Sequence, residues 1–184
     1  MPILEIAQIG NPIIRANSAT VEPHEISESS FQTLIDDMIE TMRHAGGVGI
    51  AAPQVNVGKR LFAIEVRNPD LHQDVEVYPL TIVINPELTY LSPADAPIQS
   101  WEGCLSVAGL RGQLPRFKRV LLEGLDRKGG KLLLELEGFP AIVAQHETDH
   151  LNGNVYLDRM PDMLTLCFES EYRKFHPSTE EVKD

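Results

Sequence analysis

The chain has few cysteines, few basic residues and no long apolar run, and each shortage excludes a class of protein. Two cysteines in 184 residues are too few for a disulfide-stapled scaffold. Lys and Arg number 16 against 27 Asp and Glu, a formal net charge of −11, whereas a nucleic-acid-binding surface needs clustered basic side chains. No apolar run approaches the roughly 20 residues that cross a bilayer, and the first residues lack the pattern of a secretory signal. We therefore expect a cytoplasmic protein that binds neither nucleic acid nor membrane directly.

The remaining composition is typical of a globular protein, with 42% hydrophobic and 23% charged residues. A chain of this length can bury a core without covalent staples. It contains no internal repeat and no low-complexity block. We expect a single domain over residues 1–184.

Two helices dominate the predicted secondary structure. The first is expected to be capped by Ser29 or Ser30, with Gln32 placed for a capping box. It carries an apolar face at helical spacing and stops at Gly46-Gly47. The second runs from about Pro140, a residue that suits the first helical turn, to Asn152. A last short helix is predicted over residues 164–175, and residues 1–28 are predicted to be irregular.

Between these helices the sequence predicts strands. Residues 60–66 and 80–84 are apolar, and the second strand is expected to end at Asn85-Pro86, while residues 68–79 form a polar surface loop. Residues 119–125 and 131–137 flank a Gly-Gly turn and predict a hairpin. Hairpin-joined strands with few helices favour an α+β fold over a parallel α/β sheet.

Residues 145–150, Gln-His-Glu-Thr-Asp-His, carry the strongest chemical signal. Two histidines four residues apart lie on one face of a helix, so both imidazoles can reach one metal ion. The intervening Glu147 can lean toward a water on that metal, whose pKa falls from ~15.7 toward ~7, and can move its proton. This is the His-Glu-x-x-His pattern of metal hydrolases. The alternative is a surface helix that carries two histidines by chance.

Two histidines do not complete a catalytic metal site, which usually has three protein ligands and one open position. Downstream, Asp158, Glu169 and Glu171 are candidates without a supporting pattern. Upstream, Cys104 in Glu-Gly-Cys-Leu-Ser (residues 102–106) is a better candidate because it is a soft ligand beside a glycine. A lone cysteine is otherwise most often a small buried residue.

Residues 47–54, Gly-Val-Gly-Ile-Ala-Ala-Pro-Gln, form the third informative segment. The segment lacks the features of a dinucleotide-binding loop or a P-loop. It is either a tight turn or a loop that exposes its backbone to a ligand. In the second case Gln54 presents an amide donor of the kind that an oxyanion needs.

Together, the three segments resemble peptide deformylase, a family that carries Gly-x-Gly-x-Ala-Ala-x-Gln, Glu-Gly-Cys-x-Ser and Gln-His-Glu-x-Asp-His in this order. One departure follows the second motif, where Ala108 stands in place of the usual proline. The resemblance implies antiparallel β-sheets packed around a central helix that carries the His-Glu-x-x-His motif. It implies hydrolytic removal of the formyl group from the N-terminal formyl-methionine of newly made polypeptides, with release of formate.

The resemblance also implies the site residues. One divalent metal ion is bound by Cys104, His146 and His150, with water in the fourth position. Glu147 is the general acid and base, and the oxyanion hole is formed by Gln54 and the backbone N–H of Leu105. The implied substrate contacts are Val48, Ile142 and Val143 in a methionine pocket, and Gly49, Gly103 and Arg111 along the peptide.

The native ion is expected to be Fe²⁺, as in the family, and Zn²⁺, Ni²⁺ or Co²⁺ can occupy the same ligands. Glu102, Arg116 and Asp149 either orient these ligands or form ordinary surface ion pairs. The expected partners are N-formyl-methionyl peptides and nascent chains, and the chain is a monomer or a homodimer. Residues 158–184 hold four Lys or Arg and seven Asp or Glu, so no electrostatic docking on ribosomal RNA is predicted.

Two other functions compete with this one. A metallopeptidase that cuts internal peptide bonds would share the His-Glu-x-x-His motif, but the cysteine and the loop at residues 47–54 count against it. A silent relative that only binds peptides would be expected to lose Glu147 or a metal ligand, and all three motifs are intact.

Overall fold

The computed structural model describes residues 2–67, 77–91 and 97–176. Two longer helices, α2 (Ser29–His44) and α3 (Phe139–Leu151), are accompanied by the short α1 (Pro23–Ile26) and α4 (Glu169–Phe175). The strands form two antiparallel sheets, which confirms the predicted α+β class. No helix in these residues combines the length and the apolarity that crossing a membrane requires.

The larger sheet has five strands in the order β1-β2-β3-β6-β7. These are β1 (Gly49–Ala51), β2 (Leu61–Val66), β3 (Tyr78–Tyr90), β6 (Arg119–Leu125) and β7 (Lys131–Glu137). The hairpin predicted over residues 119–137 is present as β6 and β7, paired from Arg119–Glu137 to Leu125–Lys131. The Asp126 side chain accepts the N–H groups of Lys128 and Gly130, which stabilises the turn.

The smaller sheet has the order β4-β5-β8 and was not predicted. Its strands are β4 (Ile98–Cys104), β5 (Val107–Arg116) and β8 (Cys167–Phe168). Glycines and Pro115 interrupt the alternation of apolar side chains in this region, so the period-two pattern is hidden. The β4–β5 connection is tight, and Cys104 pairs with Val107 directly across it.

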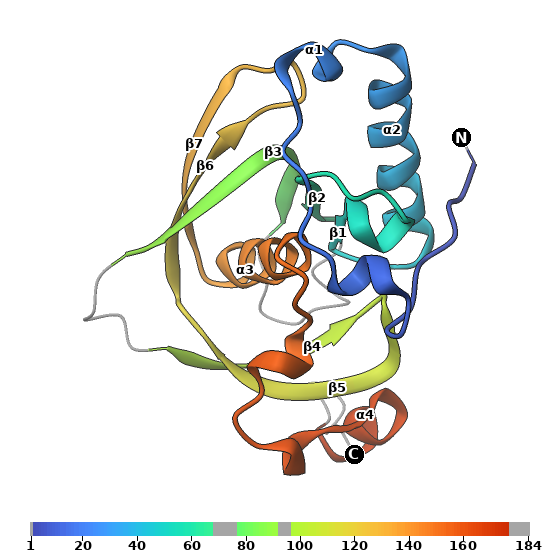
Figure 1. Cartoon of the computed structure of the whole chain (residues 1–184). Coiled ribbons are helices and arrows are strands. Elements are labelled where there is room, and N and C mark those ends of the chain that lie inside the picture. Colours follow the sequence, from blue (N-terminus) through green and yellow to red (C-terminus); the bar gives the residue numbers. More distant parts are fainter. Residues whose placement is uncertain (1, 68–76, 92–96, 177–184) are drawn as a thin grey trace.

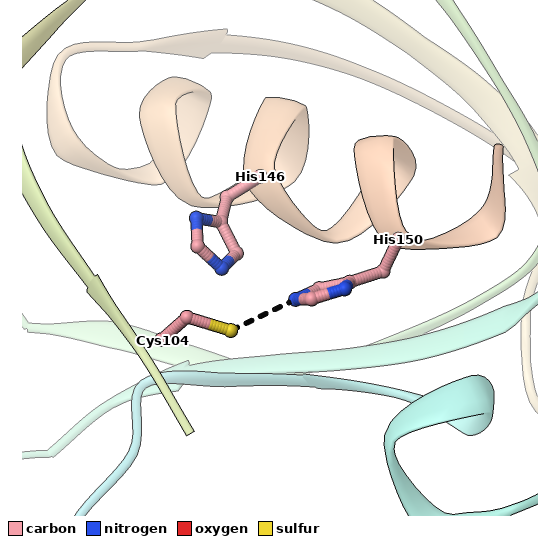
Figure 2. A group of neighbouring side chains, drawn as sticks. All are labelled: Cys104, His146 and His150. Carbon is pink, nitrogen blue, oxygen red and sulfur yellow. Dashed lines mark hydrogen bonds between the residues drawn. The ribbon is translucent and has the colours of Figure 1, made fainter. Parts of the chain in front are cut away.

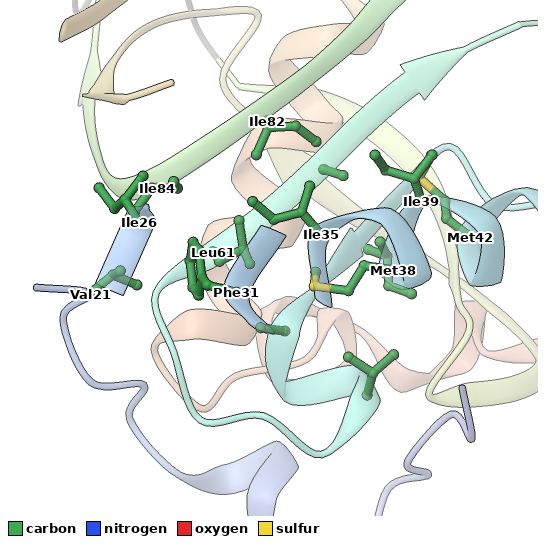
Figure 3. Packing of buried hydrophobic residues seen from close by; sticks show 14 residues of the cluster. Val21, Ile26, Phe31, Ile35, Met38, Ile39, Met42, Leu61, Ile82 and Ile84 are labelled. Atoms are coloured by element: carbon green, nitrogen blue, oxygen red, sulfur yellow. The ribbon is translucent and has the colours of Figure 1, made fainter. Parts of the chain in front are cut away.

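The larger sheet is covered on both faces at its β1–β2–β3 end. Every residue of β2 is buried, and alternate residues belong to two different clusters. Leu61 and Ala63 join the apolar face of α2, including Ile35 and Met38 (Figure 3). Phe62 and Ile64, which alternate with them on the other face of β2, pack in a second hydrophobic cluster that includes residues of α3. The position of α3 is therefore set by the sheet.

α3 lies at the centre of the molecule, between the larger sheet and β5 (Figure 1). It contacts β1, β2, β3, β6 and β7, and from Val143 to Leu151 every residue is buried. A helix buried on all sides lacks the polar outer face of a surface helix. The alternative of a surface helix that carries two histidines by chance is therefore wrong.

Several predicted boundaries need correction. The cap of α2 is Glu28 rather than Ser29 or Ser30, and the Gln32 side chain donates to the carbonyls of Ile26 and Arg127 instead of closing a capping box. β3 does not end at Asn85-Pro86, because a bulge with Asn85 at φ 52° carries the strand past the proline.

The ends of the chain also differ from prediction. Residues 1–28 contain α1 and a 3₁₀ turn at Pro12–Arg15. The region predicted as one helix over residues 164–175 holds a 3₁₀ turn (Met163–Thr165), β8 and then α4. The loop predicted at residues 68–79 falls mostly outside the described residues, and its last two residues belong to β3.

Candidate metal centre

α3 places His146 and His150 one turn apart on the same side of the helix (Figure 2). Gly138, at φ 66°, is the N-cap, and Pro140 occupies the first turn, where its missing N–H costs nothing. Gly153, at φ 71°, follows the C-terminus. Both histidines are buried, at 9% and 1% exposure.

Cys104, the last residue of β4, faces these histidines. One ligand atom from each of the three residues lies within 4.8 Å of the others. The Sγ atom of Cys104 is 3.2 Å from Nε2 of His150. Donor atoms about 2.0–2.3 Å from one ion must lie this close together, so the group fits a metal. The downstream candidates are not part of this group, since Asp158 pairs with Arg15, Glu169 with Arg111 and Glu171 with Lys174.

The other ring nitrogens of the two histidines differ in their surroundings, and that of His146 supports this fit. Nδ1 of His146 is 2.8 Å from Oε2 of Glu102, which leaves Nε2 for the metal. Nδ1 of His150 is buried, and no hydrogen-bond partner for it occurs in the described part of the chain. A site of two imidazoles and one thiolate suits zinc and accepts iron, nickel or cobalt.

Behind His146 lies a buried network of charges. Arg116 donates to both carboxylate oxygens of Glu102, at 2.7 and 3.0 Å, and to Asp149 at 2.7 Å. Burial opposes the charged form of Glu102, but hydrogen bonds with His146 and Arg116 outweigh it and lower its pKa to about 2. The alternative of ordinary surface ion pairs is therefore wrong for these three residues.

Glu147 has the opposite electrostatic environment. Its side chain is buried, and its Oε2 has no hydrogen-bond partner among the described residues. Burial is the main cause that raises its pKa to about 7, and the charge of Glu102 adds to the effect, while His146 and Arg116 oppose it. A carboxylate with such a pKa can exchange a proton near neutral pH.

The carboxylate of Glu147 needs the absence of a side chain at Gly49. A Cβ atom at Gly49 would lie 2.2 Å from Oε1 of Glu147 and 2.9 Å from Cγ1 of Val143. Backbone of β1 therefore approaches α3 more closely than any other residue would permit. This close approach explains why the second glycine of residues 47–54, Gly49, cannot be a larger residue.

Gln54 is buried in a 3₁₀ turn (Ala52–Val55) and has a defined amide orientation. Its Oε1 accepts the N–H of Ala51 at 2.8 Å. Its Nε2 consequently faces Ser106 Oγ at 3.3 Å and Cys104 Sγ at 3.6 Å. The donor end of the amide thus points toward Cys104, the position that a donor to an oxyanion beside the Cys-His-His group would need.

A cavity of about 380 Å³ opens beside these residues. Its lining includes every residue that the resemblance assigned to the site except His150: Val48, Gly49, Gln54, Gly103, Cys104, Leu105, Arg111, Ile142, Val143, His146 and Glu147. Its lining also includes Trp101, Phe139, Glu169 and Arg173, to which the motifs give no role. No sequence signal marks the last two, because contacts across the fold bring them to the cavity.

Ala108, the departure from the family pattern, lies in β5 outside the cavity lining and is exposed. Its N–H points to Oε1 of Gln8 at 3.4 Å. Gln8 also donates to the carbonyl of Leu105 at 2.9 Å. Since proline has no N–H, alanine here permits a contact that ties the N-terminal segment to the β4–β5 turn.

Comparison with known proteins gives a consistent picture. The model of the polypeptide deformylase family matches residues 3–165. Peptide deformylase 2 of Pseudomonas putida is 42% identical over 167 residues, covering 90% of this chain and 92% of the relative. A peptide deformylase of Leptospira biflexa is 44% identical over 166 residues, covering 87% and 89%.

Solved structures agree with these relatives. The class I type b peptide deformylase of Acinetobacter baumannii with bound Met-Ala-Ser superposes with a TM-score of 0.81 at 35% identity, covering 86% of this chain and 99% of that one. The peptide deformylase of Thermotoga maritima gives a TM-score of 0.77 at 34% identity, covering 88% and 100%.

Proposed function

The chain belongs to the peptide deformylase family, a family of metal-dependent hydrolases that remove the N-formyl group from nascent peptides. We propose which of its residues performs each step of this reaction. The proposal covers residues 1–184 as one catalytic domain. It depends above all on one observation. The buried carboxylate of Glu147 has an oxygen without a hydrogen-bond partner in the described part of the chain, and it lines a cavity beside a Cys-His-His group.

Cys104, His146 and His150 hold one divalent metal ion, which when bound lowers the pKa of water and polarises a carbonyl. Glu102 keeps His146 in the tautomer that presents Nε2, and Arg116 keeps Glu102 ionised. We propose Fe²⁺ as the native ion, because of the family, with Zn²⁺, Ni²⁺ or Co²⁺ as substitutes.

Glu147 moves the proton in both halves of the reaction. Its carboxylate accepts a proton from the water whose oxygen attacks the formyl carbon. It then donates that proton to the amine nitrogen as the C–N bond breaks and formate leaves. A pKa of about 7 suits both transfers, because the group is neither too weak a base nor too weak an acid at neutral pH.

Gln54 and the backbone N–H of Leu105 stabilise the oxygen of the formyl group as it gains negative charge. The Gln54 amide is held in one orientation by Ala51, so the donor needs no reorganisation when the charge develops. Both residues line the cavity beside Cys104.

The rest of the cavity binds the peptide. Val48, Ile142 and Val143 offer apolar surface for the methionine side chain, and binding there orients the formyl carbon. Gly49, Gly103 and Arg111 contact the peptide that follows. Gly49 lets the backbone of β1 lie close to Glu147, and the small space that such an approach leaves would favour formyl over a larger acyl group.

The natural substrates are N-formyl-methionyl nascent chains, and we propose that the enzyme meets them in the cytoplasm as a monomer or homodimer. The chain carries a net charge of −11, so no direct contact with nucleic acid is expected.

The test is formate release from formyl-Met-Ala-Ser by protein purified without oxygen and loaded in turn with Fe²⁺, Ni²⁺ and Co²⁺. We expect turnover by the wild type and its near-complete loss in Glu147→Gln with metal content unchanged. Metal analysis of the anaerobically purified protein identifies the native ion. Absence of formate with every metal, or equal rates for Glu147→Gln, would contradict the proposal.

A further inference from the structure

α4 contributes two charged side chains, Glu169 and Arg173, to the wall of the catalytic cavity. The helix follows the stretch that matches the family model, which ends at residue 165. The cavity is therefore formed partly by the matched family domain and partly by a segment outside it. None of the three motifs includes α4, so its two side chains add charges to the cavity that the motifs do not describe.

Aromatic and charged contacts hold α4 against the smaller sheet. The ring of Tyr172 lies 4.9 Å from that of Trp101 and 4.9 Å from that of His176. The guanidinium of Arg111 lies over the same Tyr172 ring at 5.0 Å. No residue of α4 is buried, so these contacts replace a hydrophobic core as the means of fixing the helix at the cavity.

The charged groups at this edge of the cavity form a cluster of Arg111, Glu169 and Arg173. One carboxylate oxygen of Glu169 accepts from Nε of Arg111, and the other accepts from Nε of Arg173 at 2.9 Å. Two positive charges thus share one negative charge. The Arg173 side chain is 76% exposed, compared with 22% for Arg111, and among the described residues only Glu169 accepts a hydrogen bond from it, so its other N–H donors can reach a ligand.

We infer that this cluster selects substrates by charge, favouring an acidic over a basic side chain in the first residues after formyl-methionine; the inference rests on the proposed deformylase function. A guanidinium fork binds a carboxylate with two hydrogen bonds and repels an ammonium group. The net charge of −11 on the whole chain would instead favour a basic side chain in the substrate. At physiological salt, however, exposed charges are screened beyond about 8 Å, so the nearby cluster dominates.

The experiment compares two peptide series, formyl-Met-Ala-X-Ser-amide and formyl-Met-X-Ala-Ser-amide, in which X is Glu, Gln or Lys. The terminal amide removes a competing carboxylate, and kcat/KM is measured by formate release from the metal-loaded full chain. For the wild type we expect a Glu-to-Lys ratio of about three to five in at least one series. The ratio should shrink as NaCl is added.

Two variants shift the ratio in opposite directions. Arg173→Glu should lower it about tenfold, because an attraction becomes a repulsion. Glu169→Gln should raise it, because the cluster gains a full positive charge. The matched control is Lys118→Glu, the same kind of charge reversal at a side chain that is 52% exposed and outside the cavity lining, which should leave the ratio unchanged.

A wild-type ratio at or below one in both series, or the same ratio in wild type and Arg173→Glu, would overturn the inference. An equal shift in Lys118→Glu would also overturn it, because the effect would then come from net charge. Loss of formate release from every peptide by the wild type would instead overturn the proposed function, and the inference with it. Turnover of the Gln peptides serves as the measure of intact protein.

Discussion

Oε2 of Glu102 lies 2.8 Å from Nδ1 of His146, and both side chains are buried. This contact joins the end of β4 to the middle of α3, two elements that each supply a proposed metal ligand. It orients the imidazole so that Nε2 faces Cys104. His150 has no comparable partner among the described residues, so the two histidines are supported unequally.

Replacing Glu102 by Gln should therefore weaken metal binding. The amide is a poorer acceptor and leaves Arg116 with less compensating charge, so we expect a loss of about 10- to 100-fold in affinity. The measurement is competition with a chromogenic chelator for Zn²⁺ or Ni²⁺. Glu137→Gln is the control, since Glu137 pairs with Lys118 on the surface. An unchanged affinity in Glu102→Gln would show that the contact does not support the ligand.

Gly49→Ala should lower the rate of formate release more than it lowers the amount of bound metal. The new Cβ would lie 2.2 Å from Oε1 of Glu147, so the carboxylate must move. A shift of about 1 Å can lower kcat/KM by about 100-fold. Formate release and bound metal are measured on the same sample.

Gly58→Ala is the matched control for Gly49→Ala, because a Cβ there would lie 3.5 Å from Ile13, an ordinary contact. We expect that variant to retain wild-type turnover. Full activity in Gly49→Ala would mean that Glu147 tolerates displacement, and its role as the proton carrier would need revision.

The sequence was sufficient to locate the chemistry where a short segment carries it. His146, Glu147 and His150 lie on one helix, so their juxtaposition follows from helical periodicity alone. The larger helices and the β6–β7 hairpin were also predictable, because their apolar spacing is regular. Recognition of the second motif brought in Cys104, which local pattern alone left in competition with Asp158, Glu169 and Glu171.

Features that depend on contacts between distant residues could not be predicted. β4 and β5 contain several glycines, so their pattern gave no strand signal although they carry Cys104. α4 reaches the cavity through the contact of Tyr172 with Trp101, and nothing near either residue in the sequence indicates it. The burial of Arg116 between Glu102 and Asp149 likewise appears only once the sheet and α3 are assembled.

Gln54→Glu should separate the donor role of this side chain from its packing. The variant keeps the acceptor that binds the Ala51 N–H but loses the donor at Nε2. We expect kcat to fall by about 10²–10³-fold with little change in KM, the usual effect of removing an oxyanion donor. Gln54→Met, which carries no charge, should show the same loss. Steady-state formate release at neutral pH measures both, and full kcat in Gln54→Met would contradict the assignment.

The ion pair between Arg43 of α2 and Glu65 of β2 gives a prediction for stability against pH. Arg43 donates to Glu65 at 2.8 and 2.9 Å, and this hydrogen bonding lowers the pKa of Glu65 from 4.5 in the folded state despite partial burial. A lowered folded-state pKa means that the pair stabilises the fold fully above the unfolded pKa. That stabilisation is lost as pH falls through the folded value. Glu65→Gln should therefore cost about 1 kcal/mol in the free energy of unfolding at pH 7 and less at pH 3.

Urea unfolding of wild type and Glu65→Gln at both pH values measures this difference, and comparing the two proteins at the same pH cancels any loss of metal in acid. Glu5→Gln removes an exposed carboxylate and should change stability by less than about 0.5 kcal/mol at either pH. If the gap between wild type and Glu65→Gln were the same at pH 3 as at pH 7, the cost would come from packing of the amide. The ionised pair would then not be what joins α2 to the sheet.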